Sequence, residues 1–467
     1  MVLIFVTFNQ YDEDLMRSKL IKISVAAILM LATASFAQMS GSYDVGGGSN
    51  DFATIVEAVD SLNSQGLGGA VTINVYPGTY DGYVEIAGAN ISGMGPNNPL
   101  VVRAAPGATQ PVIVKNTLGV GYGSFGFALM AAQYVTIEGF RFEDCGYGAV
   151  RLYYVGSDST HHCYVNNNDM YLPSSNYGVQ AYRIYDCEFN SNKVTCSFGA
   201  FYMFTCINSV LTNNMIYGNC QTALFASLCE NLQHYYNSIW ITGVGDNKCV
   251  RCYNSTGNIY KNNIFCHTGT NGQAMYVYST PPAVCDYNSY YSPNTYLATY
   301  TTNYSTLSEW QTATGLDMNS VYVDPHFVSQ SDLHVDPNRV SPINGGADPI
   351  AAVTVDYDGE IRSATDPDIG ADEYDVSLLD YRVQVTPESH LLHALPDTMI
   401  AYYYEVKNIG ANNDSYNLTV TGAGWTTMIF DSSGSTQITA TNVLSPNESQ
   451  WVFVRHCVPA TAGQALL

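Results

Sequence analysis

Charged residues are scarce in this chain of 467 residues, because Asp, Glu, Lys and Arg together make up only 12% of it. Basic residues are the scarcest, with 17 Lys and Arg against 40 Asp and Glu, and the formal net charge is -23. Binding to phosphate backbones and anionic surfaces depends on a surplus of Lys and Arg. We therefore expect neither nucleic acid nor an anionic membrane as a partner.

The chain also lacks a membrane-spanning run near its start. The apolar stretch from Ile23 to Leu31 is shorter than the ~20 residues that a transmembrane helix needs. Basic residues precede this stretch and small residues follow it, which is typical of a signal peptide over residues 16–37 with cleavage after Ala37. Residues 1–15 are interpreted as an upstream extension. We expect a secreted or cell-surface protein without a transmembrane span; the residues that carry this prediction are Arg17, Lys19, Lys22, Ser35 and Ala37.

A short phrase recurs between Tyr134 and Tyr291, in which an Asn stands two residues before a large apolar side chain. The copies are 22 to 26 residues apart, and self-similarity at such a period indicates a solenoid of stacked coils. Stacked amides can donate to and accept from one another inside a turn. We assign them a structural role and no catalytic one. The predicted ladder consists of Asn168, Asn192, Asn214, Asn237, Asn262 and Asn288.

Each coil carries a further strand whose second and fourth positions are apolar, so its third and fifth positions should face outward. Coils of this length with short strands and no helical pattern between them predict a parallel β-helix. The outward positions form two columns, which we call the aromatic strip. One column is Arg151, Gln180, Tyr202, Phe225, Arg251 and Tyr276; the other is Tyr153, Tyr182, Phe204, Ser227, Tyr253 and Tyr278.

The aromatic strip is the candidate ligand-binding surface, with every member except Ser227 as a predicted contact. Eight aromatic rings and two arginines on six coils would cover roughly 24 Å at ~4.8 Å per coil. Such rings stack on sugar faces while phenol and guanidinium groups bond hydroxyls, so we expect a polysaccharide as partner. Two alternatives stay open: the rings pack only on one another, or loops or the C-terminal region cover them.

Catalysis is left open by the sequence. A polysaccharide lyase needs a basic residue as its base, for which Arg151 and Arg251 are the candidates. A glycoside hydrolase needs two carboxylates ~5–10 Å apart. Four acidic residues lie near the Asn turn, but none forms a paired motif: Asp169, Asp186, Glu188 and Asp286.

No cofactor or metal site is expected. Calcium is the one ion that the sequence allows, at Asp356 to Glu360, although this segment lacks the further ligands of an EF-hand loop and is interpreted as a turn. A lone pair of cysteines, Cys249 and Cys252, has no second pair to complete a zinc site. The pair His161 and His162 likewise has no partner at metal-ligand spacing.

Eleven of the twelve cysteines lie between Cys145 and Cys285. Export would permit pairing, and stacked coils ~4.8 Å apart fall within the range of bridged α-carbons. Two columns are in register: Cys163 with Cys187, and Cys206 with Cys229. Disulfides and stacked free thiols are both compatible with this pattern.

The flanking segments have other periodicities. Residues 51–64 show helical spacing, with Asn50 or Asp51 as N-cap, and this helix should cover the first coil within a leader of residues 38–69. The solenoid is expected over residues 70–375, beginning with strands at Val71 to Val75, Leu100 to Val102 and Pro111 to Val114. From residue 376, alternating strands predict an antiparallel β-sandwich that stops before its final strand. Those strands are Tyr381 to Val385, Ile400 to Val406, Tyr416 to Thr421 and Trp451 to Val454.

The repeats resemble the right-handed parallel β-helix, or pectin-lyase-like, superfamily, in which stacked Asn residues line a turn. A second resemblance lies in residues 324–374, which we call the closing region. Its ordered phrases, such as Asp332-Leu333-His334-Val335 and Asp368-Ile369-Gly370, are similar to the segment that ends the solenoid of secreted bacterial choice-of-anchor Q proteins. The last domain resembles Ig-like modules of bacterial extracellular enzymes.

These resemblances imply an all-β chain that acts outside the cell. The leading hypothesis is a monomeric β-helix protein that binds polysaccharide, with an adhesive or structural role. The alternative is an extracellular polysaccharide lyase or glycoside hydrolase of the pectin-lyase-like superfamily. The net charge favours a neutral glycan over an anionic one.

Overall fold

The computed structural model describes residues 38–47, 51–117, 119, 121–339, 341–375, 382–387, 395–421 and 425–460. The predicted upstream extension and signal peptide lie outside the described residues. None of the helices in the described part of the chain combines the length and apolar character needed to cross a membrane.

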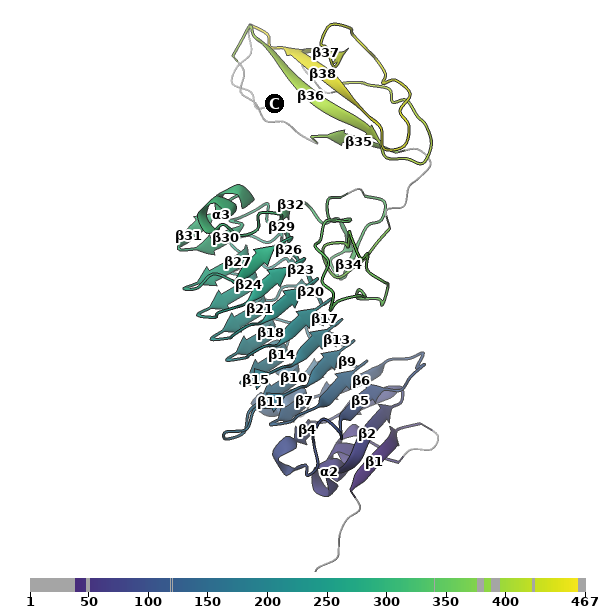
Figure 1. Ribbon diagram of the computed structural model, residues 1–467, viewed down its shortest axis with the longest axis vertical. Coiled ribbons are helices and arrows are strands. Elements are labelled where there is room, and N and C mark those ends of the chain that lie inside the picture. Colours follow the sequence, from purple (N-terminus) through teal and green to yellow (C-terminus); the bar gives the residue numbers. More distant parts are fainter. Residues whose placement is uncertain are drawn as a thin grey trace, which may run out of the picture.

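Residues 39–322 form a parallel β-helix with three ten-stranded sheets, A, B and C, which run along the solenoid in Figure 1. Neighbouring strands pair in parallel, apart from the antiparallel pair β30–β31 that ends sheet C. Sheet A comprises β1 (Met39–Val45), β2 (Leu67–Val75), β5 (Leu100–Ala104), β8 (Val135–Glu138), β12 (Tyr164–Asn166), β16 (Glu188–Asn190), β19 (Val210–Thr212), β22 (Gln233–Tyr235), β25 (Ile259–Lys261) and β28 (Val284–Asp286).

Sheets B and C follow A in each coil. Sheet B comprises β3 (Gly78–Asp81), β6 (Val112–Asn116), β9 (Arg141–Cys145), β13 (Asp169–Tyr171), β17 (Lys193–Thr195), β20 (Met215–Gly218), β23 (Ser238–Ile241), β26 (Ile264–His267), β29 (Ser289–Tyr291) and β32 (Val321–Tyr322). Sheet C comprises β4 (Val84–Ala87), β7 (Phe125–Met130), β10 (Gly148–Tyr153), β14 (Tyr177–Tyr182), β18 (Gly199–Phe204), β21 (Thr222–Ser227), β24 (Lys248–Tyr253), β27 (Gln273–Tyr278), β30 (Ala298–Tyr300) and β31 (Thr302–Tyr304). A short pair, β11 (Thr160–His161) and β15 (Ile184–Tyr185), lies between sheets C and A in the chain.

The predicted parallel β-helix is thus confirmed, and its core is the stack of inward side chains. The second and fourth positions of the sheet C strands, such as Val150, Leu152, Val179 and Ala181, are fully buried, as the alternation predicts. Several strands were missed: β1 lies in the segment that the sequence assigns to a leader, and β3, β4 and β7 lie between the early strands that were predicted.

The corner between sheets A and B explains the Asn phrase. At this corner the residue before each ladder Asn has a positive φ, as at Asn167 (57°) and Asn213 (53°). The amides of the ladder bond in series, with Nδ2 of each Asn donating to Oδ1 of the next over 2.9–3.1 Å. Its members are Asn168, Asn192, Asn214, Asn237, Asn263 and Asn288.

The prediction of Asn262 as a ladder member is therefore wrong. Asn262 has a φ of 62° and occupies the left-handed position, while Asn263 enters the ladder. Asn tolerates the left-handed conformation better than most residues, so both neighbouring amides suit the positions they hold. Asn262 instead donates from Nδ2 to the carbonyl of Asp348 at 2.7 Å.

Helices cover both ends of the solenoid. α2 (Ile55–Gln65) buries Ile55, Ala58, Val59 and Leu62 against the first coil. Its N-cap is Thr54, whose hydroxyl accepts from the backbone N–H of Glu57, and not Asn50 or Asp51 as predicted. At the other end, α3 (Leu307–Thr314) begins with a capping box and buries Trp310 over the last coil. Short 3₁₀ turns occur at η1 (Gly88–Asn90) and η2 (Gly121–Ser124).

The closing region folds back along the solenoid and includes the hairpin β33 (Phe327–Ser329) and β34 (Asp332–Val335). Its apolar residues pack on sheet B and the neighbouring corner: Leu333 and Ala371 contact the cluster of Met215, and Ile343 and Ile369 join that of Ile264. Arg362 donates to Oδ1 of Asn213 at 2.9 Å. The outward face that this region covers is therefore that of sheet B.

The C-terminal residues form one antiparallel sheet in the order β35–β36–β38–β37. These strands are β35 (Val383–Thr386), β36 (Met399–Asn408), β37 (Thr426–Asp431) and β38 (Ser449–Cys457). Two details of the prediction are wrong: Tyr416 to Thr421 makes only an isolated bridge at Asn417, and β37 was not foreseen. The Ig-like sandwich stays a prediction.

All twelve cysteines are free thiols, and eleven of them are buried. The columns were predicted correctly: the backbone N–H of Cys206 lies 3.4 Å from Sγ of Cys229, and the thiols of Cys163 and Cys187 bond one another. A third stacked pair was missed, with the sulfurs of Cys196 and Cys220 3.3 Å apart. Between the two alternatives for the paired columns, Cys163 with Cys187 and Cys206 with Cys229, the structure has stacked thiols.

Candidate functional site: the outward face of sheet C

The two predicted columns of the aromatic strip are in register on sheet C. Arg151 pairs with Gln180, Gln180 with Tyr202, Tyr202 with Phe225, Phe225 with Arg251 and Arg251 with Tyr276. The second column pairs in the same order, from Tyr153 through Tyr182, Phe204, Ser227 and Tyr253 to Tyr278. Because each pair occupies neighbouring parallel strands, all twelve side chains lie on one face.

The rings of the strip contact one another along the solenoid axis. Tyr202 and Phe225 stack with ring centroids 4.3 Å apart and an interplanar angle of 4°. The chain of contacts continues from Phe225 to Tyr253 at 6.0 Å and from Tyr253 to Tyr278 at 5.4 Å. Packing on neighbours leaves most rings half-buried, whereas Tyr278 at the end is 53% exposed. The strip is thus a continuous aromatic surface whose side chains are held in place.

Two strip residues are not available to a ligand, which corrects their assignment as contacts. Gln180 is only 1% exposed and Arg151 only 8% exposed. The guanidinium carbon of Arg151 lies 4.4 Å from the ring centroid of Tyr122 and 4.0 Å from that of Tyr153. Arg151 therefore supports the aromatic rings and does not project from the surface.

The sequence missed four rings that extend the strip: Tyr122, Tyr147, Tyr177 and Phe198. Tyr147 joins Tyr122 (5.1 Å) to Tyr177 (5.5 Å), and Tyr177 contacts Tyr202 (5.2 Å). Tyr177 opens β14 with the parity of the inward Val179 and Ala181 and is only 9% exposed, so the alternation does not point to it. Tyr122 lies in η2, which precedes β7, so nothing in the repeat points to it.

A charged group lies within the strip at β24. Asp246 forms ion pairs with Lys248 and with Arg251, whose Nη2 is 3.1 Å from Oδ2. Burial works against ionisation of Asp246, but the bond to Lys248 and the charges of Lys248 and Arg251 together lower its pKa. Burial lowers the pKa of Lys248, against the effect of Asp246. Among the described residues, no second carboxylate bonds or pairs with these three side chains.

The predicted catalytic candidates do not come together. Arg151 on β10 and Arg251 on β24 are four strands apart, or ~19 Å at the spacing of a sheet. Asp169 lies on sheet B and binds Arg141, and Glu188 and Asp286 lie on sheet A. Asp186 precedes β16 with a φ of 53°. The four acidic residues therefore do not share the face of the strip.

Glu188 has a setting of its own, in a groove between sheet A and residues 352–355 of the closing region. Burial raises the pKa of its carboxyl group. Asn190, Thr212 and Gln233 line the same groove. Since this groove is on sheet A, it is separate from the strip.

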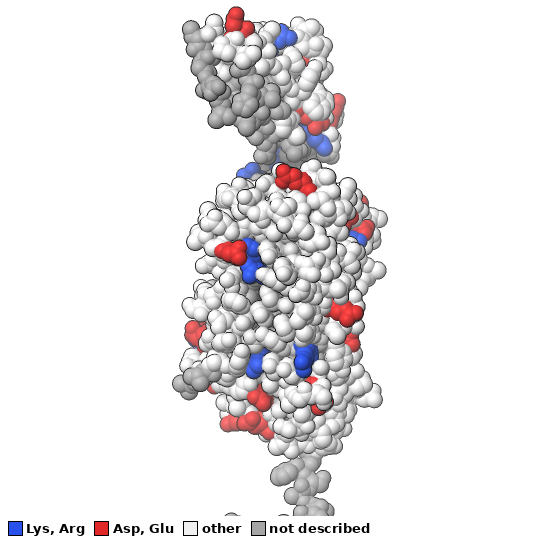
Figure 2. Space-filling model, turned by 90° about the vertical axis from the view of Figure 1, so that its left-hand side faces the viewer, with Lys and Arg blue, Asp and Glu red and all other residues white. Residues whose placement is uncertain are grey.

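The closing region leaves the strip open. No hydrogen bond or ion pair within the described residues joins the closing region to a strip side chain. On the side of the solenoid seen in Figure 2, charged side chains are few and scattered among uncharged ones. Covering by the closing region is wrong, because that region packs on sheet B; packing among the rings does occur, and Tyr122 of the connecting segment η2 lies over Arg151.

The acidic turn from Asp356 to Glu360, the segment at which the sequence allows calcium, is held by the side chain of Asp356. Its Oδ1 accepts from the backbone N–H groups of Asp358 (3.0 Å) and Glu360 (2.7 Å). Its Oδ2 accepts from the N–H of Glu373 at 3.0 Å. The side chain of Asp356 therefore closes a turn, in agreement with the interpretation of this segment as a turn.

Comparison with known proteins gives no family for this chain. No family model matches it, and no curated protein matches its sequence. Solved structures similar to it include a rhamnogalacturonan lyase (12% identity, 70% of this chain and 96% of that one, TM-score 0.32) and a pectin methylesterase from Aspergillus niger (12%, 61% and 85%, 0.27). A third is a tailspike protein of an Acinetobacter baumannii bacteriophage, described as a capsular polysaccharide depolymerase (9%, 92% and 86%, 0.23). Likenesses this low say nothing about the activity of this chain.

Proposed function

We propose that this protein binds a polysaccharide along the aromatic strip of sheet C and serves outside the cell as an adhesive or structural module. One observation carries the proposal: aromatic side chains of successive coils form a continuous, register-aligned surface that the closing region leaves open. Soluble proteins rarely expose a contiguous apolar surface without a binding role. A linear ligand suits a surface that runs along the solenoid.

The chemistry of the strip fits sugar rings. The faces of Tyr and Phe pack on the apolar C–H faces of pyranose rings, and phenol hydroxyls bond sugar hydroxyls at the ring edges. The strip spans six strands, so its length is ~24 Å, enough for several sugar units. Because the rings already pack on one another, little side-chain freedom is lost on binding.

We infer a neutral glycan as the preferred ligand. The arginine that remains partly accessible, Arg251, is already paired with Asp246. Arg151 is buried against Tyr122 and Tyr153. With a net charge of -23, the chain would also repel a polyanion at long range.

A polysaccharide lyase is the competing function, and Lys248 is the observation in its favour. A lyase needs a base, and burial lowers the pKa of this lysine, which favours the neutral amine. Lys248 is however only 1% exposed and is paired with Asp246. A side chain so enclosed does not reach a substrate proton, so binding without cleavage is favoured.

The test is glycan-array binding with and without calcium, followed by assays for unsaturated and reducing-end products on each glycan retained. We expect retention of neutral glycans, independent of calcium, and no products. Products would establish the enzyme instead. Retention of nothing would contradict a role for the strip.

A matched pair of variants locates the binding surface. Tyr278→Ala removes an exposed ring of the strip and should weaken glycan affinity by about tenfold, since a stacked ring contributes on the order of 1 kcal/mol or more. Tyr171→Ala removes a similarly exposed ring on sheet B and should leave affinity unchanged. Equal losses in both variants would place the glycan elsewhere.

A further inference from the structure

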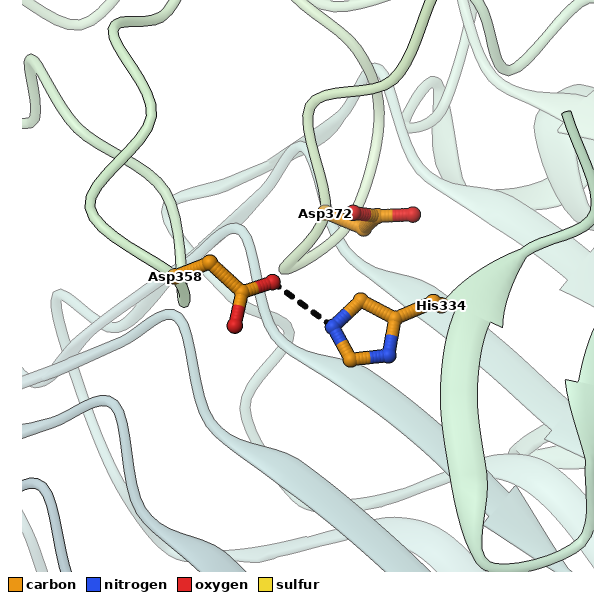
Figure 3. A group of neighbouring side chains, drawn as sticks. All are labelled: His334, Asp358 and Asp372. Atoms are coloured by element: carbon orange, nitrogen blue, oxygen red, sulfur yellow. Dashed lines mark hydrogen bonds and ion pairs between the residues drawn. The ribbon is translucent and has the colours of Figure 1, made fainter.

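Three side chains converge at the edge of the closing region, away from the aromatic strip. His334 lies on β34, Asp358 in the acidic turn and Asp372 near the end of the region, and Figure 3 shows them approaching one another from three separate segments. One ligand atom from each lies within 4.8 Å of the other two. Nε2 of His334 is 2.7 Å from Oδ2 of Asp358.

Each of the three is positioned by a bond from outside the group. Nδ1 of His334 bonds the carboxylate of Asp332, which directs Nε2 toward Asp358 and Asp372. A histidine oriented by a carboxylate through its other nitrogen is the usual arrangement of a metal-bound imidazole. Oδ2 of Asp372 accepts from the backbone N–H of Val335 at 2.8 Å. The turn closed by Asp356 fixes Asp358.

Asp372 is the most deeply buried of the three ligand residues. Its side chain is a carboxylate in a residue only 7% exposed, and it forms no ion pair among the described residues. Among the described residues, this side chain accepts one hydrogen bond, from the backbone N–H of Val335 to Oδ2. Burying a carboxylate without a compensating charge is costly.

The charges around the three residues also favour a bound cation. The carboxylates of Asp332 and Asp358 bond His334, Asp372 lies beside it, and Asp356 lies near Asp372. Lys193 of sheet B acts on Asp332 but pairs with none of them. A divalent cation among the three ligand atoms would offset this excess of negative charge.

We propose that His334, Asp358 and Asp372 form a site for a divalent transition-metal ion of the Zn²⁺ type, which fastens the closing region. One imidazole nitrogen and two carboxylate oxygens suit Zn²⁺, whereas Ca²⁺ takes oxygen ligands. Ligand atoms ~2.1 Å from a tetrahedral Zn²⁺ lie ~3.4 Å apart, so Nε2 of His334 and Oδ2 of Asp358, now 2.7 Å apart, would have to separate, and water would supply the fourth ligand. The ion would tie three segments that are 24 and 14 residues apart in sequence.

The ion would act on the structure and not on the glycan. The three ligand residues belong to the closing region, which packs on sheet B, and the strip is on sheet C. Side-chain exposures of 33% for His334 and 47% for Asp358 leave an approach from solvent. A negative result for the metal site would therefore leave the proposed glycan binding unaffected, and the reverse also holds.

The test uses the full chain without an affinity tag, stripped with a chelator and titrated with ZnCl₂ alone by calorimetry. The background variant Cys457→Ser removes the one cysteine that is not buried. We expect about one equivalent of Zn²⁺ to bind and to raise the melting temperature. Absence of binding, or CaCl₂ binding as tightly as ZnCl₂, would overturn the proposal.

Variants assign the site. Asp358→Asn and His334→Gln should each weaken Zn²⁺ affinity at least about tenfold, and Asp332→Asn, which acts through the orientation of His334, by ~10–100-fold. His162→Gln is the control, because His161 and His162 are adjacent with Nδ1 atoms 2.8 Å apart and form the other histidine group. A second control, Asp336→Asn, changes a carboxylate of the same region outside the group. Loss of affinity in either control with retention in Asp358→Asn would place the ion elsewhere.

Discussion

Asn288 donates a hydrogen bond from Nδ2 to Oδ1 of Asp317 at 3.1 Å, so the asparagine ladder ends on a carboxylate. Ser320 donates to the same oxygen at 2.6 Å. The other oxygen accepts from the hydroxyl of Tyr290 (3.0 Å) and from Nε1 of Trp310 (2.8 Å). One buried side chain thus joins the last coil, the ladder and α3.

Asp317→Ala should lower the free energy of unfolding by about 3 kcal/mol or more, because it leaves four buried donors without their acceptor. Urea denaturation followed by circular dichroism measures this change. Asp60→Ala, an exposed carboxylate on α2, is the control and should change stability by less than about 0.5 kcal/mol. Equal effects in the two variants would show that Asp317 does not terminate the solenoid.

Asn167 and Asn168 are adjacent but have different roles, so their substitutions should differ. Asn168→Ala removes a ladder amide that bonds Asn192 and the carbonyl of Ile137, and should cost about 3 kcal/mol. Asn167→Gly should be nearly neutral, since Asn167 is exposed with a φ of 57°. Thermal and urea unfolding of both variants provide the comparison, and a larger loss at Asn167 would contradict the assignment of the corner.

Arg151→Ala should lower stability and leave glycan affinity nearly unchanged, because this arginine is buried against Tyr122 and Tyr153. Cation–π contacts that are shielded from water contribute about 2 kcal/mol, so a loss of this order is expected. Tyr278→Ala should show the opposite pattern. Titration of each variant with a retained glycan measures affinity, and its urea midpoint measures stability. If Arg151→Ala lowered affinity without lowering stability, Arg151 would be a ligand contact after all.

The buried histidine His234 should make the fold sensitive to acid. Burial lowers its pKa to about 3 from the ordinary 6.5, and its ring stacks on Tyr260 with centroids 4.4 Å apart. Because the folded state holds the neutral form, the stability that His234 contributes is present above pH 6.5 and is lost as the pH falls toward 3. At pH 5 this loss is about 2 kcal/mol.

His234→Phe keeps a stacked ring without a titratable group, so it should remove that part of the acid sensitivity. The measurement is the free energy of unfolding of both proteins from pH 7.5 to pH 4.5. Burial also lowers the pKa of His267, to about 4, and this residue is present in both proteins, so their difference isolates His234. Parallel pH profiles would rule out the effect.

The stacked cysteines should be unreactive thiols. Eleven are buried, which keeps a reagent away from them. Burial raises the pKa of Cys187, Cys196 and Cys206, whereas the bond to the partner thiol lowers the pKa of Cys220 and Cys229. A thiol reagent should therefore modify Cys457 alone in the native protein and all twelve cysteines after unfolding without reductant. Each disulfide would reduce by two the number of cysteines modified after unfolding, so the count distinguishes disulfides from free thiols.

The sequence was sufficient for the regular part of the fold. The 22- to 26-residue period and the alternation within each coil predict which sheet C positions face outward, and the register of all twelve strip residues follows from them. The failure at Asn262 is instructive, since two adjacent asparagines satisfy the same phrase and only the backbone conformation distinguishes them.

The sequence was less informative where contacts are not periodic. Tyr122 covers Arg151 from a segment outside the repeat, so the burial of this arginine could not be read from its column. The acidic candidates Asp169 and Glu188 lie on different sheets, because Asp169 follows a ladder Asn whereas Glu188 precedes the next one by four residues. Sheet assignment depends on where each corner falls, and the corners are single left-handed residues of varied type.

What the sequence alone determined is the solenoid and its outward face, because every coil repeats the same local pattern and stacks on its neighbour. Only the tertiary structure decided where the closing region packs, and with it which face stays open and how His334 meets Asp358 and Asp372. The physical reason is that these contacts join segments of unrelated pattern across long separations, such as Arg362 with Asn213, and depend on shape and partner position that no local periodicity encodes.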